Sequence, residues 1–184
     1  MDPVDSRAER ERFRALVAEV ADPVRRYLWR RLDEATADDV LAETLVVLWR
    51  RLADEPREPI PWAIGIARKQ LANARRAADR RERLVTRIAV VDPPRETAPA
   101  PADSEADSDA AVRRVLAGMR PADAELLRLW SWEGLEPRQL AVALGISVNA
   151  AAVRLHRARK RFEEAFGKDA AAAGQVAVTE GGPR

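Results

Sequence analysis

Hydrophobic residues recur along this chain at spacings of three and four, which is the period of amphipathic helices. In the first half, this pattern predicts four helices, at about 13–20, 24–32, 40–52 and 62–87. A capping-box sequence from Thr36 to Asp39 is expected to start the third of them. Three prolines between positions 56 and 61 separate the third helix from the fourth. The tryptophans are expected to pack as core residues, at Trp29, Trp49, Trp62, Trp130 and Trp132.

In the second half, the same pattern predicts short helices at 112–119 and 121–132, followed by a helix-turn-helix. Pro137 suits the first position of a helix, and Gly145 suits the left-handed conformation that ends one. Ser147 is a suitable N-cap for the next helix. That helix is expected to bury one stripe of residues, Val148, Ala151, Leu155, Ala158 and Phe162.

Composition supports an all-α fold, because Ala, Leu and Arg dominate the chain. Two mildly basic blocks flank a Pro- and acid-rich segment, 91–109, which holds one basic and six acidic residues. Such a segment buries too little apolar surface to order itself. We therefore expect a flexible N-terminus (1–9), a helical domain (10–90), a flexible acidic linker (91–109), a second helical domain (110–166) and a disordered tail (167–184).

The chain has no cysteine and one histidine, which leaves no thiolate metal site and no convincing catalytic constellation. We expect neither an enzyme nor a bound metal or cofactor. The N-terminal residues lack the apolar run of a secretory signal, and no apolar stretch is long enough to span a membrane. A cytoplasmic protein is the expectation.

The helix after Ser147 has no acidic residue before Glu163, and one of its faces is basic. That face carries Asn149, Arg154, His156, Arg157, Lys160 and Arg161. A basic helix in a helix-turn-helix is typical of DNA binding, although a solvated surface helix is the plainer alternative. Asn149 and Arg154 are the best candidates for base contacts, since Asn suits adenine and Arg suits guanine.

Two further helices carry one-sided charge. The fourth predicted helix is densely basic, and Asn73 within it could contact an unstacked base. In the third, Asp39 and Glu43 lie one turn apart and so share a face. The alternative for these acids, and especially for Asp38, is simple stabilisation of a helix N-terminus.

Together these segments resemble the extracytoplasmic-function (ECF) sigma factors of bacterial RNA polymerase. ADDVLAETLVVLWRRL (37–52) is similar to the family's core-binding helix, and PWAIGIARKQLANARR (61–76) is similar to its promoter-melting helix. WEGLEPRQLAVALGIS (132–147) and VRLHRARKRF (153–162) resemble its second domain. The chain departs from the family at Ala150, Ala152 and Val153, where Thr, Lys and Ser are common, so base readout would depend more on Asn149, Arg154 and methyl contacts.

The resemblance implies that this protein binds core RNA polymerase and directs initiation at specific promoters. It assigns polymerase binding, through the largest subunits, to Asp38, Asp39 and Glu43. It assigns −10 DNA binding and melting to Arg68, Lys69, Asn73, Arg75, Arg76 and Arg80. It assigns −35 DNA binding to Ser147, Asn149, Ala150, Val153, Arg154, Arg157 and Arg161.

The resemblance also implies an anti-sigma factor as a partner. Two alternatives remain open at this point. One is a stand-alone helix-turn-helix regulator, which leaves the first block unexplained. The other is a sigma-like decoy that binds an anti-sigma factor, although known decoys of that kind carry a receiver domain that this chain lacks.

Overall fold

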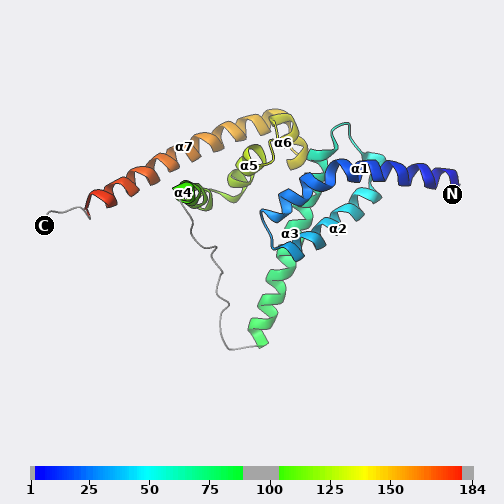
Figure 1. Ribbon diagram of the computed structural model, residues 1–184, viewed down its shortest axis with the longest axis horizontal. Coiled ribbons are helices and arrows are strands. Elements are labelled where there is room, and N and C mark those ends of the chain that lie inside the picture. The colour runs from blue at the N-terminus through cyan, green and yellow to red at the C-terminus, as the bar shows by residue number, and fades with distance from the viewer. Residues whose placement is uncertain (1–2, 89–103, 180–184) are drawn as a thin grey trace. The chain divides into compact units, whose positions relative to one another are not determined.

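The computed structural model describes residues 3–88 and 104–179, and every regular element in these ranges is helical (Figure 1). The α-helices are α1 (Pro3–Trp29), α2 (Glu34–Arg50), α3 (Pro59–Ile88), α4 (Ser104–Gly118), α5 (Pro121–Ser131), α6 (Pro137–Leu144) and α7 (Val148–Thr179). A short 3-10 turn, η1 (Leu52–Asp54), follows α2. The predicted all-α fold is confirmed.

The chain divides into two compact units. One comprises residues 1–92 together with 138–146, and the other comprises 93–137 together with 147–184. Each unit has its own set of packed helices, as expected for two small helical domains, but residues 138–146, which include most of α6, are grouped with the first unit and not with the second domain as predicted. Most of the predicted linker, 91–103, lies outside the described residues, and its last part, 104–109, forms the first turns of α4.

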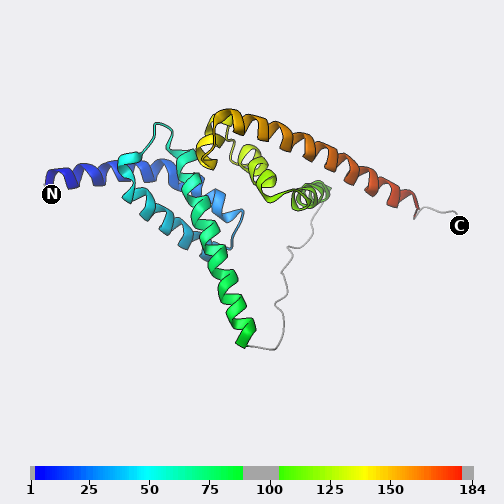
Figure 2. The same cartoon turned by 180° about the vertical axis from the view of Figure 1, so that it is seen from behind.

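In the first unit, α1, α2 and α3 pack against one another in all three pairs (Figure 2). Their buried side chains are mostly aliphatic, and the largest is the aromatic Tyr27. Thr44 is the one buried polar residue among those described, and its hydroxyl donates to the Val40 carbonyl in the preceding turn at 2.7 Å. The core of this unit is therefore largely apolar, and the Thr44 hydroxyl within it is satisfied inside its own helix.

Helix α1 is continuous where two helices were predicted. It passes through Pro23, which lacks the N–H that would bond to the preceding turn. The buried residues Leu16, Val20, Val24, Tyr27 and Leu28 are spaced by four, four, three and one, and so form one stripe on one face. Burial of this stripe against α2 and α3 outweighs the local cost of the proline.

Helix α2 begins earlier than predicted. Its N-cap is Asp33, whose carboxylate accepts a hydrogen bond from the Thr36 backbone N–H at 3.0 Å. This bond and one from the Thr36 side chain lower the pKa of Asp33, because both stabilise the charged carboxylate. The predicted Thr36 cap is wrong because Asp33 supplies the stronger acceptor three residues ahead.

In the second unit, α7 packs against α4 and α5.

The local signals of the predicted helix-turn-helix are confirmed. Helix α6 begins at Pro137, Gly145 has a φ of 66°, and the Ser147 hydroxyl accepts a hydrogen bond from the Ala150 N–H at 3.2 Å. A second left-handed glycine, Gly134 with a φ of 67°, follows α5.

Helix α7 is longer than expected. It continues to Thr179, whereas a disordered tail was predicted from 167. The added segment contains four consecutive alanines at 170–173, and alanine is the best helix former. At the start of α7, Val148 is 51% exposed and so lies outside the buried stripe predicted for this helix.

No single helix in the described ranges has the length and hydropathy to cross a membrane, although the broken pair formed by α6 and α7 meets those criteria jointly.

The tryptophans do not occupy the core, contrary to expectation. Trp29, Trp49, Trp130 and Trp132 are between 37% and 48% exposed, and Trp62 is half-buried. Most of these rings lie near an arginine, as Trp130 does, with the Arg159 guanidinium 4.9 Å from its ring centroid. An indole ring has an electron-rich face that attracts a cation, so it is stable at a partly wet surface.

Candidate functional site

Helix α2 presents an exposed face that combines acids with apolar side chains. Asp38, Asp39 and Glu43 are all exposed, and none of them forms an ion pair with another described residue. Val46 follows Glu43 one turn later and is 49% exposed. Exposed apolar residues beside uncompensated charge are typical of a surface that binds a protein.

Helix α3 carries its polar residues on two sides. Lys69, Asn73, Arg76 and Arg80 are exposed and share one side, because they are spaced by four, three and four. The Asn73 amide is held between two neighbours on the same helix: it donates to Gln70 Oε1 at 3.3 Å and accepts from Arg76 Nη2 at 2.6 Å. This side of α3 therefore has a cation fixed beside an amide, which suits backbone phosphate.

Arg68 and Arg75 lie on another side of α3. Arg75 is exposed and its Nη2 donates to the Arg31 carbonyl at 3.4 Å, in the turn that follows α1. Arg68 is half-buried, with its Nε enclosed and without a hydrogen-bond partner in the described structure. The structure therefore groups four of the six residues predicted for −10 DNA and separates these two.

Helix α7 presents its predicted DNA-binding residues from the first turn onward. Asn149, Arg154 and Arg157 are exposed, Val153 is 39% exposed, and Ala150 is half-buried. The opposite side of the helix is buried through Ala151, Leu155 and Ala158. Ser147 is exposed, but its hydroxyl is occupied as the helix cap.

Arg161 differs from the other residues in this predicted set. Its Nη1 donates to Asp123 Oδ2 at 2.7 Å, and Asp123 belongs to α5. Arg154 and Arg157 have no such ion pair among the described residues. Sequence spacing placed the three arginines together, but the structure separates Arg161 from the other two.

Two exposed residues of α7 lie on the predicted basic face but were not assigned to −35 DNA. Asn149, Val153, His156 and Lys160 are spaced by four, three and four, so His156 and Lys160 extend the outermost stripe of the helix. Both are exposed and form no hydrogen bond or ion pair within the described structure. The sequence pattern had placed both on the basic face of this helix, but it did not show that they continue the outermost stripe from Asn149.

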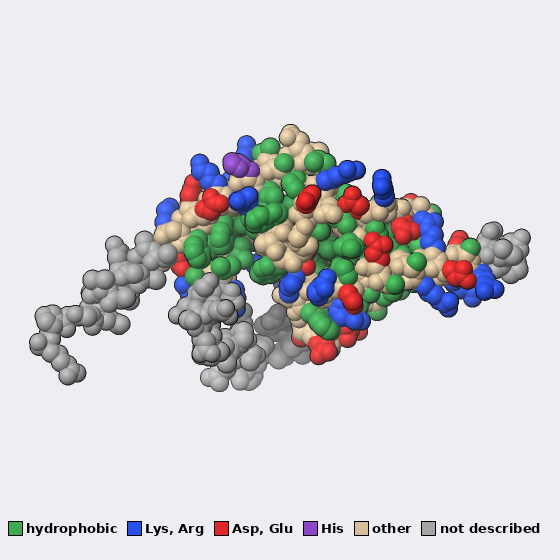
Figure 3. Space-filling model, turned by 45° about the horizontal axis from the view of Figure 1, so that its top comes forward, with side chains coloured by type: hydrophobic (Ala, Val, Ile, Leu, Met, Phe, Trp, Pro, Cys, Tyr) green, Lys and Arg blue, Asp and Glu red, His purple; other side chains and the backbone are tan. Residues whose placement is uncertain are grey.

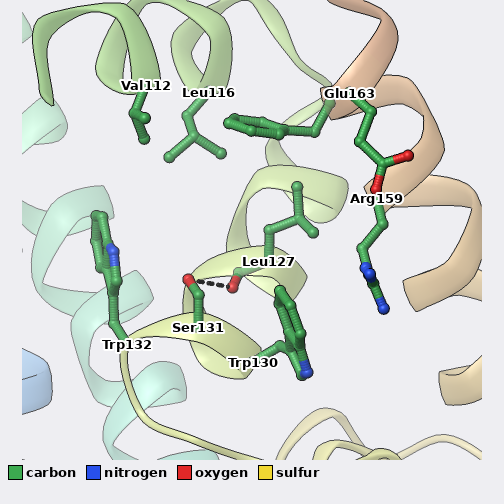
Figure 4. A pocket seen from close by; sticks show the side chains of 9 residues that line it. Val112, Leu116, Leu127, Trp130, Ser131, Trp132, Arg159 and Glu163 are labelled. Carbon is green, nitrogen blue, oxygen red and sulfur yellow. Dashed lines mark hydrogen bonds between the residues drawn. The ribbon is translucent and has the colours of Figure 1, made fainter. Parts of the chain in front are cut away.

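The second unit also contains an apolar groove of about 490 Å³ between α4, α5 and α7 (Figure 4). Leu116 and Val112 line it from α4, and Leu127 and Trp130 line it from α5. Trp132, just after α5, contributes a second exposed indole. Patches of hydrophobic side chains are visible between the charges on the molecular surface in Figure 3.

Comparison with known proteins covers both units. Residues 16–81 match the family model for Sigma-70 region 2, and residues 109–162 match the model for Sigma-70, region 4. The chain is 34% identical to the RNA polymerase sigma factor CarQ of Myxococcus xanthus over 164 residues, which covers 85% of this chain and 90% of that protein.

Two solved structures share the fold. The structure of CnrH in complex with the cytosolic domain of CnrY aligns with a TM-score of 0.57 at 21% identity, covering 85% of this chain and 88% of that one. The sigma factor RpoE of Bartonella quintana, solved with the anti-sigma factor NepR, aligns with a TM-score of 0.50 at 16% identity, covering 90% and 98%.

The match to Sigma-70 region 2 excludes a stand-alone helix-turn-helix regulator. Such a regulator would have no use for a region 2 domain at residues 16–81. The order of the two regions, the all-helical units and the similarity to CarQ over most of both chains agree with one another. This chain belongs to the sigma-70 family of transcription initiation factors and is an extracytoplasmic-function sigma factor.

Proposed function

We propose that the outer face of α2 binds core RNA polymerase through its largest subunits. The observation that supports this assignment is the exposure of Asp38, Asp39 and Glu43 beside Val46, with no internal ion pair among the described residues to neutralise the acids. A basic surface on the polymerase would gain attraction from these acids and would cover the valine.

Promoter binding divides between α3 and α7 in this proposal. Lys69, Asn73, Arg76 and Arg80 follow the backbone of the −10 strand, and Arg68 and Arg75 support that track from its flank. Asn149 and Arg154 contact −35 base edges, while Val153 and Ala150 contribute methyl contacts. Arg157 contacts phosphate, and Ser147 fixes the start of the helix. His156 and Lys160 join this set because they are exposed on the same stripe.

The observation that carries the DNA-binding assignment is the exposed face of α7. It begins at a capped N-terminus, contains no acid before Glu163, and includes Asn149, Arg154 and Arg157 with no internal ion pair among the described residues. A helix with these properties is suited to enter a major groove with its first turns.

Run-off transcription with core polymerase tests this function directly. Promoter fragments are selected by the protein and then transcribed with core polymerase in the presence and absence of this chain. Defined transcripts that require the chain are expected. Selected fragments that bind the protein but yield no transcript with core polymerase would instead support a decoy or a regulator.

We further propose an anti-sigma partner, with the polymerase complex acting in the cytoplasm. The support is the state of the two similar structures, each a complex with a second protein, of which NepR is named as an anti-sigma factor. The groove beside Trp130 and Trp132 is apolar, with Arg159 and Glu163 at its rim, which suits a protein segment better than nucleic acid. A Trp132→Ser variant tests this contact. It is expected to lose binding to a co-purified anti-sigma factor while it retains DNA binding through α7.

A further inference from the structure

Asp123 forms a charged cluster that joins two helices of the second unit. It is the third residue of α5, and its side chain is only 13% exposed. The same oxygen, Oδ2, accepts from Arg161 Nη1 at 2.7 Å and from Arg120 Nη2 and Nε at 2.8 and 3.0 Å. One carboxylate therefore holds an arginine that precedes α5 and an arginine in the middle of α7.

This cluster differs from an ordinary surface ion pair. Exposed pairs contribute little because water and salt screen them. Here the carboxylate is largely withdrawn from solvent, and it lies in the first turn of a helix, where negative charge is favoured. Releasing Arg161 would leave a partly buried carboxylate with one partner instead of two, which opposes the release.

The cluster affects which arginines are available to DNA. Arg161 lies one turn after Arg157 and two turns after Arg154, so spacing alone gives all three the same role. The guanidinium of Arg161 is engaged with Asp123, whereas those of Arg154 and Arg157 form no ion pair among the described residues. A phosphate would have to displace a neighbouring carboxylate to bind Arg161.

We propose that Asp123 is a positioning residue for the recognition helix and acts through Arg161. It ties the middle of α7 to the first turn of α5, and it withholds Arg161 from the phosphates that the other arginines bind. This inference rests on the proposed DNA-binding function of α7, but the ion pair itself is testable in the absence of DNA.

The first experiment measures the pair in the free, full-length protein. Thermal unfolding is recorded for Asp123→Asn, Arg161→Ala and the double variant. Each single variant is expected to lower the melting temperature, and the double variant is expected to lower it by less than the sum, because both changes remove the same interaction. Additive effects would overturn the inference, whatever happens with DNA.

The second experiment measures binding of the full chain to a short duplex of mixed sequence over a range of salt concentrations. Arg161→Ala should leave the dependence of log affinity on log salt unchanged. Asp123→Asn should steepen it by up to about 0.9, the value for one added phosphate contact, and should do so only when Arg161 is present. A slope that becomes shallower by that amount in Arg161→Ala would show that Arg161 already binds phosphate, and would overturn the inference.

Asp169→Asn provides the matched control. It removes the same charge from another ion pair involving α7, that between Asp169 and Arg114 at 2.9 Å. Its slope should equal that of the parent, and an equal steepening in this variant would reduce the Asp123 effect to general charge and overturn the inference. If the parent itself shows no salt-dependent DNA binding, the proposed function falls together with the DNA half of this inference.

Discussion

Helices α2 and α7 expose similar apolar groups among charges of opposite sign. Val46 on α2 is 49% exposed and Val153 on α7 is 39% exposed. Asp39 and Glu43 accompany the first valine, while Asn149 and Arg157 accompany the second. Exposed valine is therefore common to both surfaces, and the sign of the surrounding charge distinguishes the face proposed to bind polymerase from the face proposed to bind DNA.

The helix caps follow the same division. Asp33 begins α2 with a charged acceptor, and Ser147 begins α7 with a neutral one. Both side chains satisfy a backbone N–H in the first turn. A carboxylate at the start of α7 would repel the phosphates that its first turn is proposed to approach, whereas a carboxylate at the start of α2 extends an acidic surface.

The largest effect is expected from reversing the charge of the acidic face of α2. Asp39→Arg combined with Glu43→Arg should weaken binding to core polymerase by on the order of a hundredfold, because like charges then face each other. Pull-down or titration with core polymerase measures this loss. Glu9→Arg combined with Glu19→Arg, at exposed positions of α1, makes the same charge change and should bind nearly as the parent does. Unchanged binding in a folded α2 variant would remove the interface from this helix.

On α7, base contacts should have the next largest effect. Asn149→Ala and Arg154→Ala should each relax preference at particular −35 positions, by roughly 1–3 kcal/mol. Selection from a library of −35 variants measures this preference for each protein. A uniform loss of affinity, with no position losing discrimination, would show that α7 meets DNA in a different orientation.

The phosphate contact of Arg157 should have a smaller and sequence-independent effect. Arg157→Ala should make the dependence of log affinity on log salt shallower by about 0.9, with the −35 preference unchanged. Arg159→Ala is the control on the same helix, because Arg159 lies over the Trp130 ring instead of facing outward with Asn149. Equal slopes for the two variants would contradict the assigned face.

The smallest effect concerns the Asp33 cap of α2. Hydrogen bonds to its carboxylate lower the pKa of Asp33, so its contribution to stability is complete at neutral pH and is lost as the pH falls through the lowered pKa. Asp33→Ala should lower the urea midpoint slightly at neutral pH. Asp33→Asn should retain the cap and lose this acid sensitivity, since Asn caps as well as Asp but does not titrate. Parallel pH profiles for parent and Asp33→Asn would show that the carboxylate does not stabilise α2.

Much of this fold follows from local sequence patterns. Pro137, Gly145 and Ser147 marked both ends of α6 and the start of α7 correctly, because each acts on the backbone within a few residues. The continuity of α1 through Pro23 was missed, since packing against two other helices decides it. The exposure of Trp132 was missed for a related reason: a ring beside an arginine is stable at the surface, and sequence does not show which cation lies near.

Site residues were less predictable than helices. Spacing gave the common face of Asp39 and Glu43 and the outward position of Asn149. It could not distinguish Arg157 from Arg161, because the difference depends on Asp123, which lies 38 residues before Arg161 in sequence. Ion pairs between helices depend on tertiary placement, which periodicity along one helix does not contain.

Thr44 has a consequence for how this protein can change over generations. Its hydroxyl bonds to a carbonyl of its own helix, α2, and the other buried side chains described in the first unit are aliphatic except for the ring of Tyr27. The register of these helices then depends on the shapes of apolar side chains, and cores of this kind tolerate substitutions that conserve volume. The outward residues of α2 and α3 are accordingly free to diverge without unfolding their scaffold. The same three helices could therefore acquire new partners while the interior drifts slowly among aliphatic residues of similar size.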